Sequence, residues 1–169
     1  AVNLAEVTEE VFGMFRTRLE DCGVEALMRI DPAMPAFLGS RLEMRQVLLH
    51  LVENAIDAMP DGGKLTVEGR VRAVEGGSEE TLFGDGTDGS TGKVVEIRVC
   101  DTGEVIPEAV RGDIFQPFFT TREVGKGKGL GLAVCRSLVE TRQGRIELEK
   151  SLPGNTCFRI LLPFEKVPA

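Results

Sequence analysis

The chain has 169 residues, of which 42% are hydrophobic, enough for one ordinary domain with a buried core. Its 27 acidic residues outnumber its 20 basic ones, and the net charge of -7 excludes a general nucleic-acid-binding surface, which needs a positive field. No apolar run approaches the roughly 20 residues of a membrane-spanning helix. We therefore expect a single domain with no nucleic-acid partner, no membrane contact and only local anion sites.

The four cysteines, Cys22, Cys100, Cys135 and Cys157, are scattered among apolar neighbours. They form no C-x-x-C pair, and the chain has a single histidine, so a zinc site is not expected. This cysteine usage fits a reducing compartment best, and we expect the domain to be cytoplasmic.

The N-terminal third predicts a helix followed by a strand. Hydrophobic residues at helical spacing indicate a helix over residues 4–20, which ends at the "DCG" of residues 21–23. The segment "VEALMRID" reads as a strand that ends at Pro32. A turn at Gly39 then leads to Ser40, which can cap the next helix.

The helix predicted over residues 41–59 has two distinct faces. One face is a broad apolar stripe formed by Met44, Val47, Leu48, Leu51, Val52, Ala55, Ile56 and Met59. The other face is polar and carries Gln46, His50, Glu53, Asn54 and Asp57. A polar helix face is normally only solvated, but these oxygen and imidazole groups also suit Mg²⁺ bridging phosphates.

The remaining elements are mostly strands. Alternating patterns predict strands at 64–72 and 93–100 and a C-terminal pair at 145–149 and 158–162, joined by a turn at 153–155. Residues 75–92 are rich in Gly, Ser and Asp, which indicates a flexible loop. A last helix over 130–142 should bury Leu130, Val134, Leu138 and Val139 and stop at a left-handed Gly144. This order predicts a two-layer α/β sandwich, a mixed sheet covered on one face by helices.

The run "GKGKGLGL" at residues 125–132 leads directly into that last helix. Glycines allow backbone N–H groups to turn toward an anion, and a helix N-terminus adds positive potential. Arg122, Lys126 and Lys128 add local charge, so the segment points to phosphate. The alternative is a mobile glycine-rich loop without a ligand. A Walker-type loop is excluded because no Lys-Ser/Thr follows the final glycine.

Two further segments combine a tight turn with candidate contacts. In "VCDTGEVIP", a strand ends at Asp101, which can accept a hydrogen bond from an exocyclic amine such as that of adenine, while Gly103 permits close approach. The alternative is an aspartate that only bonds its own turn. In "DIFQPFFTTR", Phe115, Phe118 and Phe119 suggest a hinged lid, although each phenylalanine alone would more commonly be packing.

Taken in order, these segments resemble the catalytic, ATP-binding domain of a sensor histidine kinase, a member of the GHKL group. "HLVENAIDAM" resembles the N box, "DTGEVIP" the first glycine box, "DIFQPFFTTR" the F box and "GKGLGLAV" the second glycine box. "GRIELEKSLPGNTCFRILLP" resembles the closing strand pair, so the likeness spans nearly the whole chain.

The resemblance implies that Mg·ATP binds between the N-box helix and the lid. It assigns Asn54 to Mg²⁺ and Asp101 with Gly103 to adenine. It also implies a set of further nucleotide contacts: Asp57, Ile106, Phe115, Phe118, Arg122, Lys126, Gly127, Lys128, Gly129, Leu130, Gly131 and Leu132. The implied partners are the phosphoacceptor dimerisation helices of a parent kinase, which this fragment lacks, and a response regulator.

His50 occupies the first position of the N box, where the family usually has asparagine. Chemotaxis-type kinases have histidine there, and related chaperone, gyrase and mismatch-repair ATPases have a glutamate that activates the nucleophile. We therefore expect His50, with Glu53 in second place, to act as a base or to polarise the site. His50 does not resemble a phosphoacceptor, because Leu51 rather than an acid follows it.

Three positions depart from the family pattern and favour weaker nucleotide binding. Val105 replaces the second glycine of D-x-G-x-G, Lys128 replaces a small hydroxyl residue, and Cys157 stands where threonine is common. The leading hypothesis is γ-phosphoryl transfer from Mg·ATP to a partner histidine. A non-catalytic nucleotide sensor ranks second, and an ATPase that drives conformational change ranks third.

Overall fold

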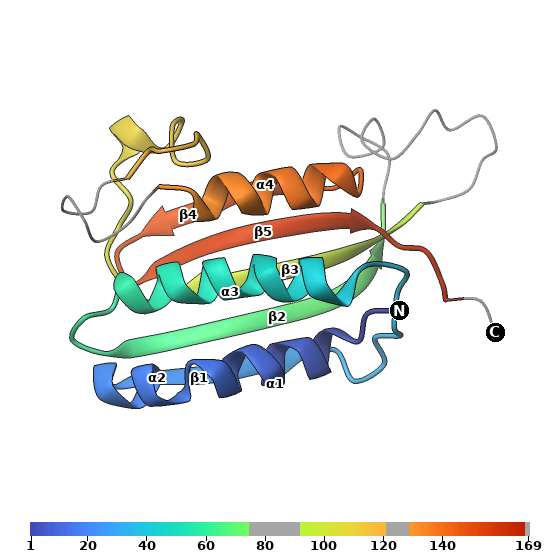
Figure 1. The fold of residues 1–169 in the computed structure, drawn as a ribbon, viewed down its shortest axis with the longest axis horizontal. Coiled ribbons are helices and arrows are strands. Elements are labelled where there is room, and N and C mark those ends of the chain that lie inside the picture. The colour runs from blue at the N-terminus through green and yellow to red at the C-terminus, as the bar shows by residue number, and fades with distance from the viewer. Residues whose placement is uncertain (75–91, 121–128, 168–169) are drawn as a thin grey trace.

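The computed structural model describes residues 1–74, 92–120 and 129–167. Its centre is a five-stranded sheet of order β1-β2-β3-β5-β4, in which β1 and β2 are parallel and the other neighbours are antiparallel. The long helices lie against one face of this sheet (Figure 1). The predicted two-layer α/β sandwich with a mixed sheet is confirmed.

The predicted first helix is two helices, so the expectation of one continuous helix over 4–20 is wrong. Helix α1 spans Leu4–Met14 and α2 spans Arg16–Cys22, with Phe15 between them at φ -98° and ψ 5°. Gly13, a poor helix former, lies just before this break. The expected stop is confirmed, because Gly23 is left-handed and leads into β1, Val24–Ile30.

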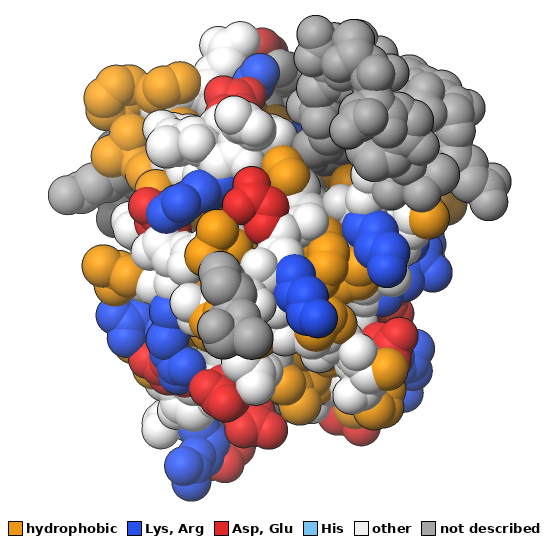
Figure 2. Space-filling model, turned by 90° about the vertical axis from the view of Figure 1, so that its right-hand side faces the viewer, with side chains coloured by type: hydrophobic (Ala, Val, Ile, Leu, Met, Phe, Trp, Pro, Cys, Tyr) orange, Lys and Arg blue, Asp and Glu red, His pale blue; other side chains and the backbone are white. Residues whose placement is uncertain are grey.

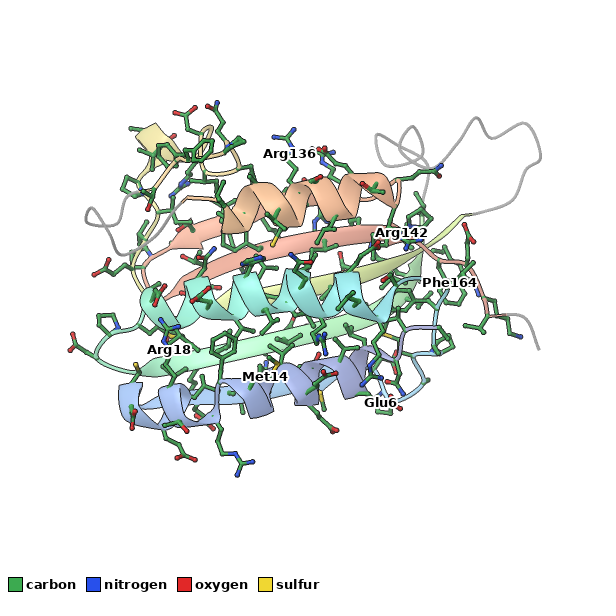
Figure 3. The ribbon with its side chains drawn as sticks, in the orientation of Figure 1. Glu6, Met14, Arg18, Arg136, Arg142 and Phe164 are labelled. Atoms are coloured by element: carbon green, nitrogen blue, oxygen red, sulfur yellow. A yellow bond between two sulfur atoms is a disulfide. The ribbon has the colours of Figure 1, made fainter. Side chains whose placement is uncertain are left out.

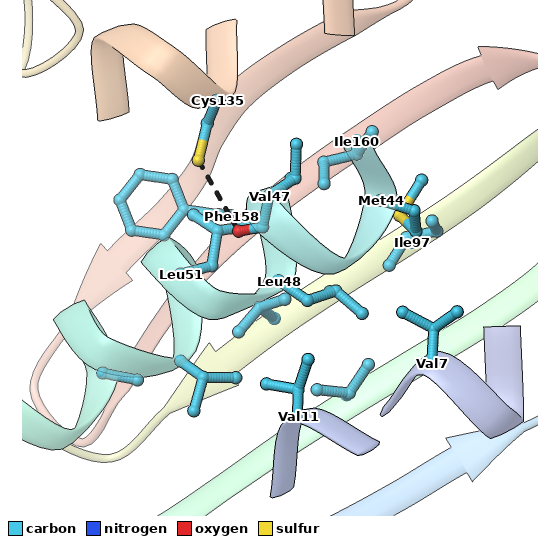
Figure 4. Packing of buried hydrophobic residues seen from close by; sticks show 14 of the residues in the cluster. Val7, Val11, Met44, Val47, Leu48, Leu51, Ile97, Cys135, Phe158 and Ile160 are labelled. Atoms are coloured by element: carbon cyan, nitrogen blue, oxygen red, sulfur yellow. Dashed lines mark hydrogen bonds between the residues drawn. The ribbon is translucent and has the colours of Figure 1, made fainter. Parts of the chain in front are cut away.

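Helix α3, Arg41–Asp57, is the centre of the helical layer. The Ser40 side chain caps it by accepting a hydrogen bond from the Glu43 N–H at 3.2 Å. Its apolar stripe is buried as predicted, with Val47, Leu48 and Leu51 packed between neighbouring elements (Figure 4). Because one face is fully used for packing, the opposite polar face is left for other contacts.

The strands follow the predicted order with slightly longer bounds. They are β2, Gly63–Ala73, β3, Lys93–Asp101, β4, Arg145–Leu152, and β5, Asn155–Pro163. Nearly all of the predicted loop at 75–92 lies outside the described residues. The register sets Asp101 of β3 opposite Thr156 of β5, which places the first glycine box beside the C-terminal hairpin.

Helix α4, Gly131–Thr141, buries Cys135 and Val139. Leu130 was expected to face inward, but it precedes the helix and is exposed. The left-handed residue after the helix is Gln143 at φ 56°, not Gly144 as expected. Gly144 instead allows close packing on β5, since a Cβ there would lie 2.6 Å from the Leu161 carbonyl oxygen.

The sheet face away from the helices is polar and carries a buried carboxylate, Glu96. Arg70 Nε lies 2.6 Å from its Oε2, and Arg72 Nε, Arg98 Nη2 and Arg159 Nη1 lie 3.4, 3.8 and 3.7 Å from its Oε1. Burial acts to raise the pKa of Glu96, but the Arg70 hydrogen bond and the surrounding guanidinium charges hold it below its ordinary value.

A disulfide joins Cys100 to Cys157 across β3 and β5. The two residues are 57 positions apart, so only the strand register brings them together. Cys135 is buried, and Cys22 is partly exposed, as free thiols. Disulfides are rare in reducing compartments, so this bond does not support the compartment expected from the cysteine spacing.

The end of the domain opposite the glycine boxes has a mixed surface. Figure 2 shows charged side chains of both signs interspersed with hydrophobic ones on this end. Within the described ranges, no helix has both the length and the apolar character needed to cross a bilayer.

Candidate functional site

The N-box helix turns its polar face toward the start of α4. A Cβ added to Gly131 would lie 3.2 Å from His50 Nδ1, so the second glycine box and the N box are in direct contact. His50 and Asn54 are one turn apart on this face and are both partly buried. The alternative that His50 is only a solvated surface residue therefore loses support, because the side chain faces another predicted motif.

Asp101 is the buried carboxylate of the helix-covered side, with only 6% of its surface exposed. Its Oδ1 accepts a hydrogen bond from the Gly103 N–H at 2.9 Å, so the turn-bonding alternative is realised. Burial raises the pKa of Asp101 to about 6, and that backbone hydrogen bond only partly opposes the rise. No cation pairs with Asp101 among the residues that the structure describes, so it retains acceptor capacity for a ligand.

Gly103 is required by close packing on the end of α3. A Cβ at this position would lie 2.3 Å from the Ala58 carbonyl oxygen. That oxygen already accepts a hydrogen bond from the Glu104 N–H at 3.0 Å. The first glycine box is therefore fixed to the N-box helix by backbone contacts, while the close approach of Gly103 to a ligand stays a prediction.

Two buried hydroxyls beside Asp101 were not predicted. Ser151 Oγ and Thr156 Oγ1 are 2.8 Å apart, and Ser151 also accepts a hydrogen bond from the Ile106 N–H at 2.9 Å. Arg111 donates to the carbonyl oxygens of Ile106 and Ser151 at 2.9 and 2.7 Å. The sequence could have indicated Thr156, because this polar residue occupies a core-facing position in the alternation of β5.

The F-box phenylalanines have two different roles. Phe115 packs edge-on against Phe158, with ring centroids 6.1 Å apart, and Phe119 also packs against the core. Phe118 is 77% exposed and has a φ of 65°, which is rare outside glycine. Phe118 is therefore the most exposed of the three, while Phe115 and Phe119 are partly buried.

The second glycine box is seated against the F box. Gly129 has a φ of 64°, and a Cβ there would lie 2.5 Å from the Phe119 carbonyl oxygen. Helix α4 begins at Gly131 with no side-chain cap among the described residues, whereas Asn3 and Ser40 cap α1 and α3. Leu132, the other predicted contact here, is partly buried. Uncapped N–H groups suit a phosphate.

Four predicted phosphate-side residues lie outside the described residues: Arg122, Lys126, Gly127 and Lys128. Their assignments stay predictions. The other predicted site residues gather at one end of the domain, where α3 ends and α4 begins.

Two predicted site residues on α3 are engaged by another helix. Arg18 of α2 places Nη1 3.3 Å from Glu53 Oε1 and donates through Nη2 to Asp57 Oδ1. The sequence motifs did not include Arg18. Both carboxylates are thus partly neutralised by Arg18, although the Glu53 side chain stays 45% exposed.

The side-chain oxygens of this site suit a magnesium ion whose ligands come mainly from the phosphates of a nucleotide. No cluster of three or more His, Cys, Asp or Glu side chains suited to a metal occurs in residues 1–74, 92–120 or 129–167. Mg²⁺ commonly takes one or two protein oxygens and completes its shell with water and substrate phosphates. The Asn54 amide oxygen, one turn from the His50 that contacts the start of α4, suits that arrangement.

Comparison with known proteins gives a consistent result. Residues 39–166 match the family model described as histidine kinase-, DNA gyrase B- and HSP90-like ATPase. The chain is 39% identical over 121 residues to sensor kinase CckA of Brucella abortus, covering 72% of this chain and 12% of CckA. It is 32% identical over 165 residues to the sensory histidine kinase/phosphatase NtrB of Salmonella typhimurium, covering 97% of this chain and 44% of NtrB.

The fold is also that of a solved kinase domain. The nucleotide-free catalytic domain of histidine kinase ThkA superposes with a TM-score of 0.74 at 26% identity, covering 96% of this chain and 93% of that one. The chain spans less than half the length of the two curated relatives, so it corresponds to one part of each of them.

Proposed function

Since the chain belongs to the histidine kinase-, DNA gyrase B- and HSP90-like ATPase family and is a histidine kinase ATP-binding domain, we propose that it presents Mg·ATP for phosphoryl transfer to a histidine. The acceptor would lie on the dimerisation helices of a longer parent kinase. The observation that carries this proposal is that the four boxes contact one another: the first glycine box meets the N box at Ala58, the second meets it at His50, and Gly129 meets the F box at Phe119.

Each described residue has a distinct task in this proposal. Asp101 accepts a hydrogen bond from the adenine amine, and Gly103 holds the turn after Asp101 close against α3. The uncapped N-terminus of α4 donates to the phosphates, and Asn54 offers an oxygen to Mg²⁺. The metal ion supplies charge neutralisation on the phosphate oxygens.

His50 is proposed to polarise the incoming nucleophile. Phosphoryl transfer depends mainly on positioning and charge, so a nearby base contributes a limited part of the rate. His50→Ala should reduce phosphotransfer far more than it reduces ATP binding. Equal losses in both would contradict the role of a base.

The parent protein is proposed to act with a response regulator in the cytoplasm, where ATP is available. One structure of ThkA is a complex with the response regulator protein TrrA, and it matches this chain with a TM-score of 0.70 at 27% identity. The same likeness supports a comparable partner for the parent of this domain.

The first test is calorimetric titration of ATP, with and without Mg²⁺, into the intact chain, Asp101→Ala and the surface control Asp21→Ala. We expect binding that depends on Mg²⁺, that Asp101→Ala abolishes and that Asp21→Ala leaves unchanged. Absence of binding by the intact chain would refute the proposal. Binding without transfer to any supplied phosphoacceptor domain would instead favour the nucleotide-sensing alternative.

A further inference from the structure

Arg18 reaches the candidate nucleotide site from an element that no motif covers. It lies on the short helix α2 and extends toward α3 (Figure 3). Its guanidinium contacts Glu53 and Asp57, which are one turn apart on α3. A planar guanidinium can hold two carboxylates at once, which a lysine ammonium does less well.

The two carboxylates belong to the helix face that carries the N-box asparagine. At about 100° per residue, Asp57 lies about 60° from Asn54 around the helix axis, and Glu53 lies about 100° from it on the same side. His50 lies about 40° from Asn54 on that same side and contacts the start of α4, whereas Arg18 of α2 contacts Glu53 and Asp57. Arg18 therefore covers the side of this face that lies toward α2.

The charge on this face matters because the proposed ligand is strongly anionic. Two uncompensated carboxylates beside a triphosphate would repel it, and the chain as a whole already carries a net charge of -7. Arg18 adds one positive charge where the N-box helix has two negative ones. It also fixes the Asp57 side chain toward α2 rather than toward α4.

We propose that Arg18 is a positioning residue for Mg·ATP. It holds the Asp57 and Glu53 carboxylates toward α2 and neutralises part of their charge, so that the N-box face accepts the triphosphate. This role rests on the proposed function, since it requires the phosphates to lie on that face.

The test is calorimetric titration of Mg·ATP into five forms of the chain: wild type, Arg18→Ala, Arg18→Lys, Arg18→Ala/Asp57→Asn and Arg16→Ala. Arg16 is an exposed residue of the same short helix and serves as the matched control. Each form is first checked by thermal unfolding, so that a change in affinity is not confused with loss of the fold. Every titration is repeated at high ionic strength.

Arg18→Ala should weaken Mg·ATP binding about fivefold, and this loss should shrink at high salt because it is electrostatic. Arg18→Lys should be intermediate, and Arg16→Ala should match the wild type. The double variant should recover most of the affinity, because Asp57→Asn removes the carboxylate that Arg18 neutralises.

Two results would overturn the role of Arg18 while leaving the proposed function intact. One is wild-type affinity in Arg18→Ala. The other is a loss that Asp57→Asn does not restore, which would mean that Arg18 does not act through this carboxylate. Failure of the wild type itself to bind Mg·ATP would instead refute the proposed function.

Discussion

Strand β3 carries two buried carboxylates on opposite faces of the sheet, and the protein treats them in opposite ways. Glu96 is 3% exposed and is surrounded by arginines from β2, β3 and β5. Asp101 is 6% exposed and is held by the backbone N–H of Gly103. The pKa of Glu96 lies below its ordinary value despite burial, whereas burial raises the pKa of Asp101 to about 6.

This difference separates a structural carboxylate from a ligand-binding one. The charge of Glu96 is already compensated within the sheet, so the group has little capacity left for another molecule. Asp101 is costly to bury and lacks a cationic partner in the described part of the chain, which is a common property of functional sites.

The largest expected effect is on Glu96. Glu96→Gln should lower the free energy of unfolding by about 3 kcal/mol, because it leaves several guanidiniums without their shared anion. Denaturant unfolding measures the change, with Glu149→Gln, which removes one partly exposed pair with Arg98, as the control. A loss no larger than that of the control would show that Glu96 is not the centre of the cluster.

Gly103→Ala probes the backbone that holds Asp101. The added Cβ would lie 2.3 Å from the Ala58 carbonyl oxygen, so the first glycine box must shift away from α3. We expect a loss of about 2 kcal/mol in unfolding free energy together with weakened ATP binding. Gly112→Ala is the control, since its Cβ would meet nothing within 4 Å. Equal behaviour of the two variants would contradict the tight contact.

Asp101→Asn should stabilise the folded domain by about 1 kcal/mol at pH 7 while weakening ATP binding. The pKa of Asp101 is raised from 3.8 to about 6, so the folded state holds its proton more tightly than the unfolded state. The contribution of the Asp101 carboxyl to wild-type stability therefore falls as the pH rises from 3.8 to about 6, and it stays lower at higher pH. Unfolding at pH 7 and at about pH 3, below the unfolded-state pKa of 3.8, should show a gain that vanishes at the lower pH. A gain that persists there would contradict burial as the cause.

The stabilisation that Glu96 provides should depend on pH in the opposite direction to that of Asp101, and it should change less near neutral pH. Its lowered pKa means that its stabilisation is complete above about pH 4.5 and is lost as pH falls through the folded-state value. The stability difference between wild type and Glu96→Gln should therefore be constant from pH 7 to pH 5 and decline only in more acidic solution. A difference that already declines above pH 5 would mean that the arginines do not hold the carboxylate in its charged form.

Much of the fold was predictable because the chain has clear local signals. The apolar stripe and Ser40 cap of α3, the alternation of the strands and the turn at 153–155 are properties of neighbouring residues. The break at Phe15 and the left-handed Gln143 were missed, because packing against the rest of the domain decides those conformations. The ordered motifs were sufficient to predict the family, which the comparisons confirm.

The sequence by itself determined the apolar stripe and polar face of α3, the strand that ends at Asp101 and the order of the four boxes. Only the tertiary structure decided which side chains meet. Strand register places Thr156 opposite Asp101 and Cys100 opposite Cys157, and helix packing brings Arg18 to Asp57 and Gly131 to His50. The reason is physical: local patterns report which face a residue occupies, whereas pairings between residues 39 to 81 positions apart depend on how whole elements pack.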